Sequence, residues 1–178
     1  MIPVFIVSII LSHSSFDRLR KTAYSLSETA ITNQVKRIDL NLNTRINLID
    51  SSLQSLADII SSNCSEEGLL SESSVSPENY AKNMIAPFSE IRAAIIALNG
   101  NQFYSTDNKR TLNKQVISSI LEVIEANPSK SIFSSGNSSA FIGKSNSNGF
   151  LLYKAVTQNG KIIGAIIFEL SYRTMGYN

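Results

Sequence analysis

Residues 16–62 read FDRLRKTAYSLSETAITNQVKRIDLNLNTRINLIDSSLQSLADIISS, and neither proline nor glycine occurs between Pro3 and Gly68. The mean step between the large apolar residues in the second part of this stretch is about 3.6, the period of one face of an α-helix. The stretch therefore predicts one long helix that ends near Asn63. The residues that define its apolar stripe are Ile31, Val35, Ile38, Leu42, Ile46, Ile49, Leu53, Leu56 and Ile60.

This helix is too long for a compact domain to bury along its whole length, because at about 1.5 Å per residue it reaches roughly 70 Å. An apolar stripe left in water would be a large exposed patch. We therefore expect the upper part of the helix to pack on the domain that follows it. The lower part should pack on the same helix of a second copy, which predicts a homodimer.

The N-terminus begins with an apolar run of about eleven residues, Met1–Leu11, which is shorter than the roughly 20 residues that cross a bilayer. It also lacks the basic region of a signal peptide. It is either the outer half of a membrane anchor or an apolar strand or helix of a soluble protein. We favour the partial anchor, because an apolar N-terminus that runs into a long helix is typical of membrane-anchored sensors. The predicted organisation is a partial anchor (1–15), a stalk and dimerisation helix (16–63) and a sensor domain (64–178).

Downstream of the long helix, the pattern predicts helices and paired strands. Ser76 followed by Pro77 starts a short helix that ends near residue 85. Asn-Gly pairs at 99–100 and 159–160 predict two hairpins. The predicted order is strands at 91–98 and 102–106, a helix at 111–126, short strands at 131–134 and 140–144, and long strands at 150–157 and 162–170. Sequence-adjacent hairpins with intervening helices indicate an α+β fold, a PAS-like antiparallel sheet domain behind a long N-terminal helix.

Composition excludes several classes of function. The chain has 178 residues, of which 43% are hydrophobic and 17% charged, with a net charge of +2 and no basic cluster. No nucleic acid partner is therefore expected. No Gly-rich phosphate loop and no hydrolase elbow occurs, so neither an enzyme nor a cofactor is predicted. A polar surface made largely of serine and asparagine is common outside the cytoplasm.

Single cysteine and histidine residues limit metal and redox chemistry. Cys64 is either a reactive or intermolecular thiol, the redox candidate of this chain, or a small residue at a helix end. His13 has no second histidine with ligand spacing, so no metal site is predicted. It is expected near a membrane surface, with no catalytic role.

Ligand-binding side chains are expected at strand ends and in the segments beside them, where a small molecule would lie between the sheet and its covering loops. Two arginines among them have the geometry to hold a carboxylate through paired hydrogen bonds. Each residue has the alternative of a solvated or structural role. The candidates are Arg92, Tyr104, Ser105, Asp107, Arg110, Phe133, Tyr153 and Lys154.

Two segments, IIALNGNQFYST (95–106) and LLYKAVTQNGKIIGAIIFELS (151–171), resemble the extracytoplasmic sensor domains of bacterial signalling proteins, the Cache and related PAS-like group. That group has a strand-turn-strand before a helix, and a closing strand pair with the pattern dGk.iGv. The resemblance implies a non-catalytic sensor in the inner membrane, with its domain facing the periplasm or the extracellular side.

A narrower resemblance is to the CSS-motif sensor domains of EAL-type cyclic diguanylate phosphodiesterases, in which the helix ends at a cysteine and a later strand reads iyCSS. Cys64 matches the first position, while Tyr104 stands at the second cysteine position, followed by Ser105 and Thr106. The family's two cysteines can form a disulfide, which one cysteine cannot form within the chain. Redox switching is therefore in doubt.

The leading functional expectation is a sensor that feeds cyclic diguanylate turnover, in which a shift or rotation of the long helix carries the signal. The alternatives are a Cache-type ligand-binding domain of a histidine kinase or chemoreceptor, and a pilin-like or secretion assembly protein. A pilin would show a processing site and an early glutamate, and neither occurs in Met1–Leu11.

Overall fold

The computed structural model describes residues 2–64, 76–136, 139–142 and 149–171. Contacts divide the chain into two compact units, Met1–Arg45 and Ile46–Asn178. The elements in chain order are α1 (Ile2–Asn63), α2 (Pro77–Ile85), β1 (Ile91–Leu98), the 3-10 turn η1 (Asn99–Asn101), β2 (Gln102–Ser105), α3 (Lys114–Ala126), β3 (Ile132–Gly136), β4 (Gly149–Gln158) and β5 (Lys161–Ser171).

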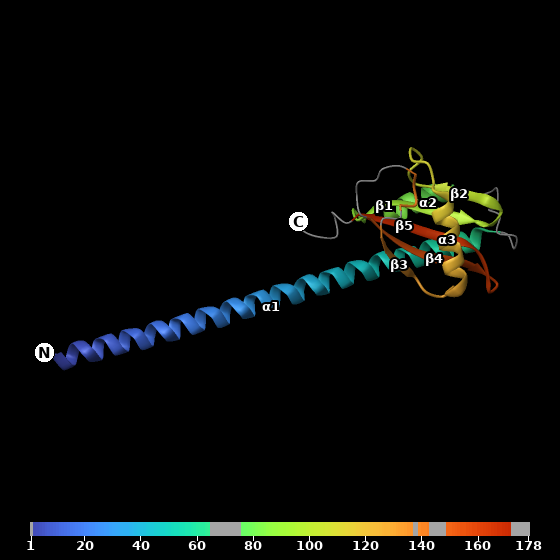
Figure 1. Ribbon diagram of the computed structural model, residues 1–178. Helices are drawn as coiled ribbons and strands as arrows, with labels where there is room; N and C mark the ends of the chain where they lie inside the picture. The colour runs from blue at the N-terminus through green and yellow to red at the C-terminus, as the bar shows by residue number, and fades with distance from the viewer. Residues whose placement is uncertain (1, 65–75, 137–138, 143–148, 172–178) are drawn as a thin grey trace. The chain divides into compact units, whose positions relative to one another are not determined.

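The five strands form one antiparallel sheet in the order β2-β1-β5-β4-β3. The first strand of the domain therefore pairs with the last, at the centre of the sheet. Figure 1 shows α3 crossing one face of this sheet, with the C-terminal turns of α1 along the other. The predicted α+β fold with an antiparallel sheet is confirmed.

The long helix is continuous from Ile2 to Asn63. Its C-terminal end agrees with the prediction, but it begins earlier than residue 16. Pro3 explains why the start is tolerated, since a proline in the first turn removes an N–H that has no helical partner. Among the described residues, no helix carries an apolar window long enough to cross a membrane.

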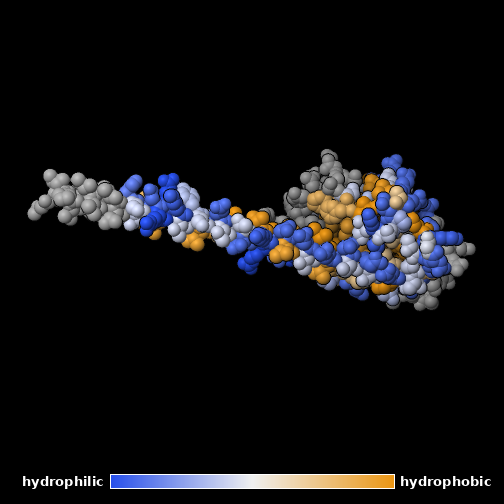
Figure 2. Space-filling model, turned by 90° about the horizontal axis from the view of Figure 1, so that it is seen from below, coloured by the Kyte–Doolittle hydropathy of each residue, from blue (hydrophilic) through white to orange (hydrophobic). Residues whose placement is uncertain are grey.

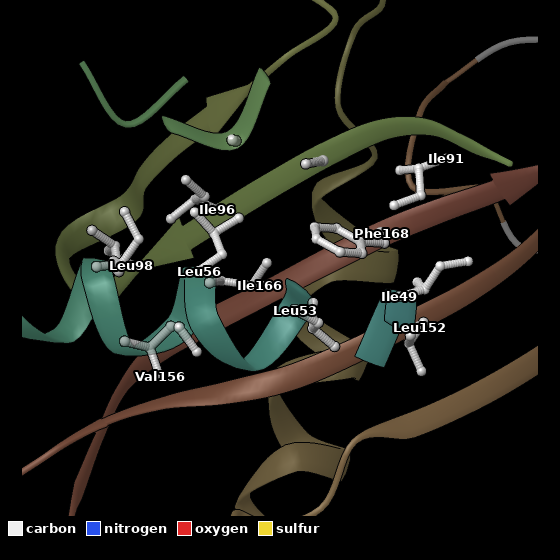
Figure 3. Close-up of a cluster of buried hydrophobic side chains, with 14 of the residues drawn as sticks. Ile49, Leu53, Leu56, Ile91, Ile96, Leu98, Leu152, Val156, Ile166 and Phe168 are labelled. Atoms are coloured by element: carbon white, nitrogen blue, oxygen red, sulfur yellow. The ribbon is translucent and has the colours of Figure 1, made fainter. Parts of the chain in front are cut away.

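The face of the sheet that receives the last turns of α1, here called the α1 face, holds the larger apolar core. Leu53 and Leu56 are fully buried there against strand residues such as Ile96 and Phe168, as Figure 3 shows. Burial of each such side chain stabilises the fold by about 1.5–3 kcal/mol. The expected packing of the upper part of the helix on the sheet is confirmed.

The opposite face, here called the α3 face, is covered by α3. This helix is amphipathic and buries Ile117, Ile120 and Ile124 against strand residues that include Ile95 and Ile167. The sheet is thus apolar on both sides, which explains why its central strands read as nearly continuous apolar runs. Any small-molecule site in this unit must therefore lie between a helix or loop and one of two faces.

Within the first unit, the apolar stripe of α1 is solvent-exposed. Ile31 and Val35 are each about 60% exposed, and Ile38 is 42% exposed. Figure 2 shows apolar and polar side chains beside one another along this helix. The homodimer that this stripe predicts stays a prediction, as do the domain boundaries at residues 15 and 63.

Turn chemistry explains both hairpins. In the β4–β5 turn, Asn159 has φ of 50° and Gly160 has φ of 78°, and Gln158 pairs with Lys161 around them. Two consecutive positive φ values define the primed turn that suits a hairpin. The β1–β2 connection is the short 3-10 turn η1, in which Asn101 takes the positive φ of 62°.

Two predicted elements of the sheet domain also differ from the structure. The helix predicted at 111–126 starts at Lys114, because the Asn113 side chain caps it by accepting a hydrogen bond from the Val116 N–H. Leu112 instead forms an isolated β-bridge with Phe141. The predicted strand at 140–144 is reduced to that bridge in its described part, and residues 143–144 lie outside the described residues.

Candidate functional site

The eight side chains predicted to reach a ligand divide between the two faces of the sheet. Ser105 and Tyr153 lie on the α3 face. Arg110 is bonded to Glu169 of that face and also to Asp107, so these two residues belong to the same group. The other four lie on the α1 face or at the irregularity in the β1–β5 pairing: Tyr104, Lys154, Phe133 and Arg92. The structure therefore brings half of the predicted set to one face and separates it from the rest.

An ion-pair cluster of Asp107, Arg110 and Glu169 lies on the α3 face. Arg110 Nε donates to Asp107 Oδ2 at 2.6 Å, and Nη1 donates to both carboxylate oxygens of Glu169 at 3.2 Å. The guanidinium also lies over the Phe141 ring, 3.9 Å from its centroid. Glu169 is a buried strand residue, with 2% of its side chain exposed, so this arginine ties the segment after β2 to the centre of the sheet.

Electrostatics favour the charged forms of Asp107 and Arg110. The hydrogen bond from Arg110 lowers the pKa of Asp107 below its ordinary value. Burial alone would lower the pKa of Arg110, but its hydrogen bond to Asp107 and the charge of Glu169 outweigh burial and raise it. Arg110, which was predicted to hold a ligand carboxylate, thus binds two carboxylates of the protein itself.

The sequence reasoning missed two members of this site, Glu169 and Phe141. Glu169 carried a usable signal, because it is the one charged residue in the apolar run Ile162–Leu170. A charged residue in the interior of a strand that is otherwise apolar needs a partner. Phe141 carried no such signal, because its role depends on the loop that brings it over Arg110.

A cleft of about 290 Å³, here called the α3 cleft, opens between α3 and the strands β3 and β4. The cleft and the ion-pair cluster share one neighbouring pair of strand residues. Leu151 lines the cleft, and its register partner on β5 is Glu169. Burial raises the pKa of Tyr153, so its phenol stays protonated at neutral pH. The lining residues are Gln115, Val116, Ser119, Ile120, Val123, Ser134, Leu151 and Tyr153.

A second and more polar cleft, of about 210 Å³, lies on the α1 face. Lys154 and Asp58 contribute charges of opposite sign to it. The Lys154 ammonium donates to the Ser129 carbonyl at 3.2 Å, and Gln54 donates to Asp58 at 2.7 Å. Lys154 thus lies at a cleft, as predicted for a binding residue, but on the face opposite to Tyr153.

The remaining predicted residues have structural contacts. Phe133 is 45% exposed and packs on Phe150 with 5.0 Å between ring centroids. Arg92 Nη2 donates to Ser171 Oγ at 3.2 Å. Tyr104 packs against the core of the α1 face. None of these three lines either of the two clefts described above.

Cys64 is buried at the C-terminal end of α1, and burial raises the pKa of its thiol above the ordinary value. A buried thiol with a raised pKa is a poor nucleophile at neutral pH. The pKa of Tyr104 is raised by burial, by the charge of Glu78 and by the charge of Cys64. Cys64 belongs to the apolar core of the α1 face, and Tyr104 packs against the same core.

Solved structures share this fold, although no protein-family model and no curated protein matches the chain. The ligand-binding domain of the Campylobacter jejuni chemoreceptor Tlp3 in complex with L-norvaline superposes with a TM-score of 0.57 at 15% identity, over 85% of this chain and 62% of that domain. The fold is that of chemoreceptor ligand-binding domains. The Pseudomonas aeruginosa amino acid chemoreceptor domain PctB with L-Arg gives 0.53 at 10% identity, over 76% of this chain and 53% of that one.

The likeness covers the sheet domain and its long helix, so the predicted PAS-like, Cache-type fold is confirmed. This chain spans less than two thirds of the length of the Tlp3 and PctB domains. At these identities the likeness concerns the fold.

Proposed function

We propose that this chain is an extracytoplasmic ligand-sensing domain of a membrane-bound bacterial signalling protein, of the Cache type found in chemoreceptors and histidine kinases. The observation that carries the proposal is the fold shared with the Tlp3 and PctB domains, which bind L-norvaline and L-Arg. A cleft of about 290 Å³ against the sheet supplies space for a small ligand. This is near the lower end of the usual range of ligand pockets.

In this proposal the α3 cleft is the ligand site, and Tyr153 is the predicted binding residue that lines it. Asp107 and Arg110 lie in the segment that follows β2. The hydrogen bond from Arg110 to Glu169 holds this segment beside the cleft. Ser105 supports that segment, because its hydroxyl accepts from the Asp107 N–H at 3.1 Å. Binding roles for Arg92, Tyr104, Phe133 and Lys154 stay predictions.

The proposed sensor has no catalytic role of its own and passes its signal through α1. The residues near the N-terminus anchor the protein to the inner membrane, and the apolar stripe of α1 pairs two copies. A small displacement of such a helix is a known form of signal transmission. The sensing unit faces the periplasm or the extracellular side.

A thermal-shift screen of the full chain against a library of small metabolites tests the sensing role. Ser119→Leu fills the α3 cleft, and Ser118→Leu is the matched control. Both serine hydroxyls donate to a backbone carbonyl of α3: Ser119 to Gln115 O at 3.1 Å and Ser118 to Lys114 O at 3.0 Å. Only Ser119 lines the cleft. We expect at least one compound to raise the melting temperature of the wild type and of Ser118→Leu, and to have no effect on Ser119→Leu. A library without any such compound would count against a sensing role.

A second candidate function is the CSS-motif type that feeds cyclic diguanylate turnover. One observation favours it: Cys64 and Tyr104, which stand at the two cysteine positions of that motif, pack in the same apolar core. The fold comparisons favour the chemoreceptor type over this candidate. The assembly-protein alternative gains no support from them.

The variant Tyr104→Cys tests the CSS-motif correspondence. If the two positions are equivalent to the motif's cysteines, an oxidant will form a disulfide between residue 64 and residue 104, because bridged Cα atoms must lie within about 7 Å. Intact-mass measurement after thiol alkylation reports the bond, and Gln102→Cys on the same strand is the control. Two free thiols in the oxidised Tyr104→Cys variant would remove the support for this candidate.

A further inference from the structure

The α3 cleft is lined by uncharged groups along its described surface. Its polar groups are the hydroxyls of Ser119, Ser134 and Tyr153 and the amide of Gln115, and the rest of the lining is aliphatic. The phenol of Tyr153 is protonated at neutral pH because burial raises its pKa. The cleft therefore offers neutral hydrogen-bond donors and acceptors beside an apolar wall.

Arg110 and Lys114 both have contacts within the protein. The guanidinium of Arg110 donates hydrogen bonds to the carboxylates of both Asp107 and Glu169. Lys114, which precedes the first cleft residue of α3, lies 5.6 Å from the centroid of the Phe103 ring. A ligand carboxylate in this cleft would find no counter-charge among the described lining residues.

Burying an ionised group without a partner costs far more than burying a hydroxyl or amide that finds a hydrogen bond. We infer that the α3 cleft binds a small uncharged molecule that has an apolar side and one or two hydroxyl or amide groups, and that it rejects free amino acids and carboxylates. This inference rests on the proposed sensing role of the cleft. It separates this chain by ligand class from the amino-acid-bound domains that share its fold.

Three probes with one carbon skeleton test the inference: 4-methylpentanamide, 4-methylpentanoate and L-leucine at pH 7.5. Each is titrated to millimolar concentration into the ¹⁵N-labelled full chain, and amide shifts of α3, β3 and β4 report binding. We expect the neutral amide to bind at least about tenfold more tightly than the carboxylate or the amino acid. Burying a charge without a partner costs more free energy than a tenfold change in affinity represents.

Variants assign that binding to the cleft. Ser119→Leu should abolish the shifts produced by the amide, and Ser118→Leu should leave them unchanged. Tyr153→Phe should weaken amide binding several-fold while the spectrum stays that of a folded protein, because it removes one hydroxyl from the lining.

The outcomes separate the inference from the proposed function. Binding of L-leucine or of the carboxylate as tightly as the amide, lost in Ser119→Leu, would overturn the inference and leave the sensing role in place. Absence of shifts with all three probes would also overturn the inference, whereas the thermal-shift library decides the sensing role independently.

Discussion

At the scale of single residues, the most informative group is the buried carboxylate of Glu169. The sequence placed Asp107 and Arg110 among the site candidates through their type and position after a strand. It did not reveal that Arg110 bonds to Glu169, because that contact joins residues far apart in the chain. In the structure Arg110 is therefore not a free cation, because it links the segment after β2 to β5.

Replacement of Arg110 by methionine should destabilise the domain strongly. Glu169, with 2% of its side chain exposed, would lose its partner, and breaking a buried pair from one side costs about 3 kcal/mol. Asp107→Asn is the milder comparison, because Asp107 is partly exposed and Glu169 keeps its arginine. Urea unfolding at pH 7 measures both. A smaller loss in Arg110→Met than in Asp107→Asn would contradict this role of the pair.

The same cluster predicts a dependence of stability on pH. Arg110 lowers the pKa of Asp107 in the folded state, so the stabilisation is complete above the unfolded-state pKa, about 3.9, and is lost as pH falls through the folded pKa. Between pH 5 and pH 3, Asp107→Asn should therefore lose less stability than the wild type. Denaturant midpoints across that range measure the difference, and parallel curves for the two proteins would refute it.

At the scale of elements, periodicity and turn chemistry predicted most of the fold. The end of α1, the bounds of α2 and β1, and the β4–β5 turn all follow from local rules about proline, asparagine and glycine. The start of α3 did not, because Leu112 was counted as part of the helix stripe although it pairs with Phe141. Long-range pairing overrode local propensity there.

Gly160 and Gly164 of the β4–β5 hairpin should respond differently to substitution. A Cβ at Gly164 would clash with the Ala97 carbonyl oxygen on the neighbouring strand. Gly164→Ala should therefore destabilise the domain by about 3 kcal/mol, at the upper end of overpacking costs. Gly160 has open space around it and φ of 78°, so Gly160→Asn should cost less than about 1 kcal/mol. Thermal unfolding compares them, and equal losses would rule out this account of the β1–β5 contact.

At the scale of the whole molecule, the sequence identified the helix and the sheet but not the face of the sheet on which the α3 cleft opens. Side-chain alternation assigns strand residues to two faces, and both faces here are apolar. The candidates at strand ends were therefore divided between two opposite faces, and only the packed structure separates them. The α3 cleft also depends on which turns of α3 lie over β3 and β4, which no local pattern specifies.

The exposed stripe of α1 predicts that the chain dimerises. Val35→Asp places a charge on the stripe, where the wild-type side chain is 60% exposed in the single chain, and Leu40→Asp places it off the stripe at a residue 66% exposed. We expect the wild type and Leu40→Asp to sediment as dimers and Val35→Asp as a monomer, because burying an unpaired charge in an apolar seam is costly. A monomeric wild type in sedimentation velocity would contradict the dimer.

We propose the space between α3 and the sheet as the ligand site of a sensing domain. Crystallographic fragment screening of the full chain tests it most directly, because it shows where small molecules bind without a prior choice of compound. We expect hits to gather in the α3 cleft, in contact with Tyr153 and Ser119, and to be uncharged. Hits confined to the polar cleft beside Lys154 on the α1 face, with none in the α3 cleft, would contradict it.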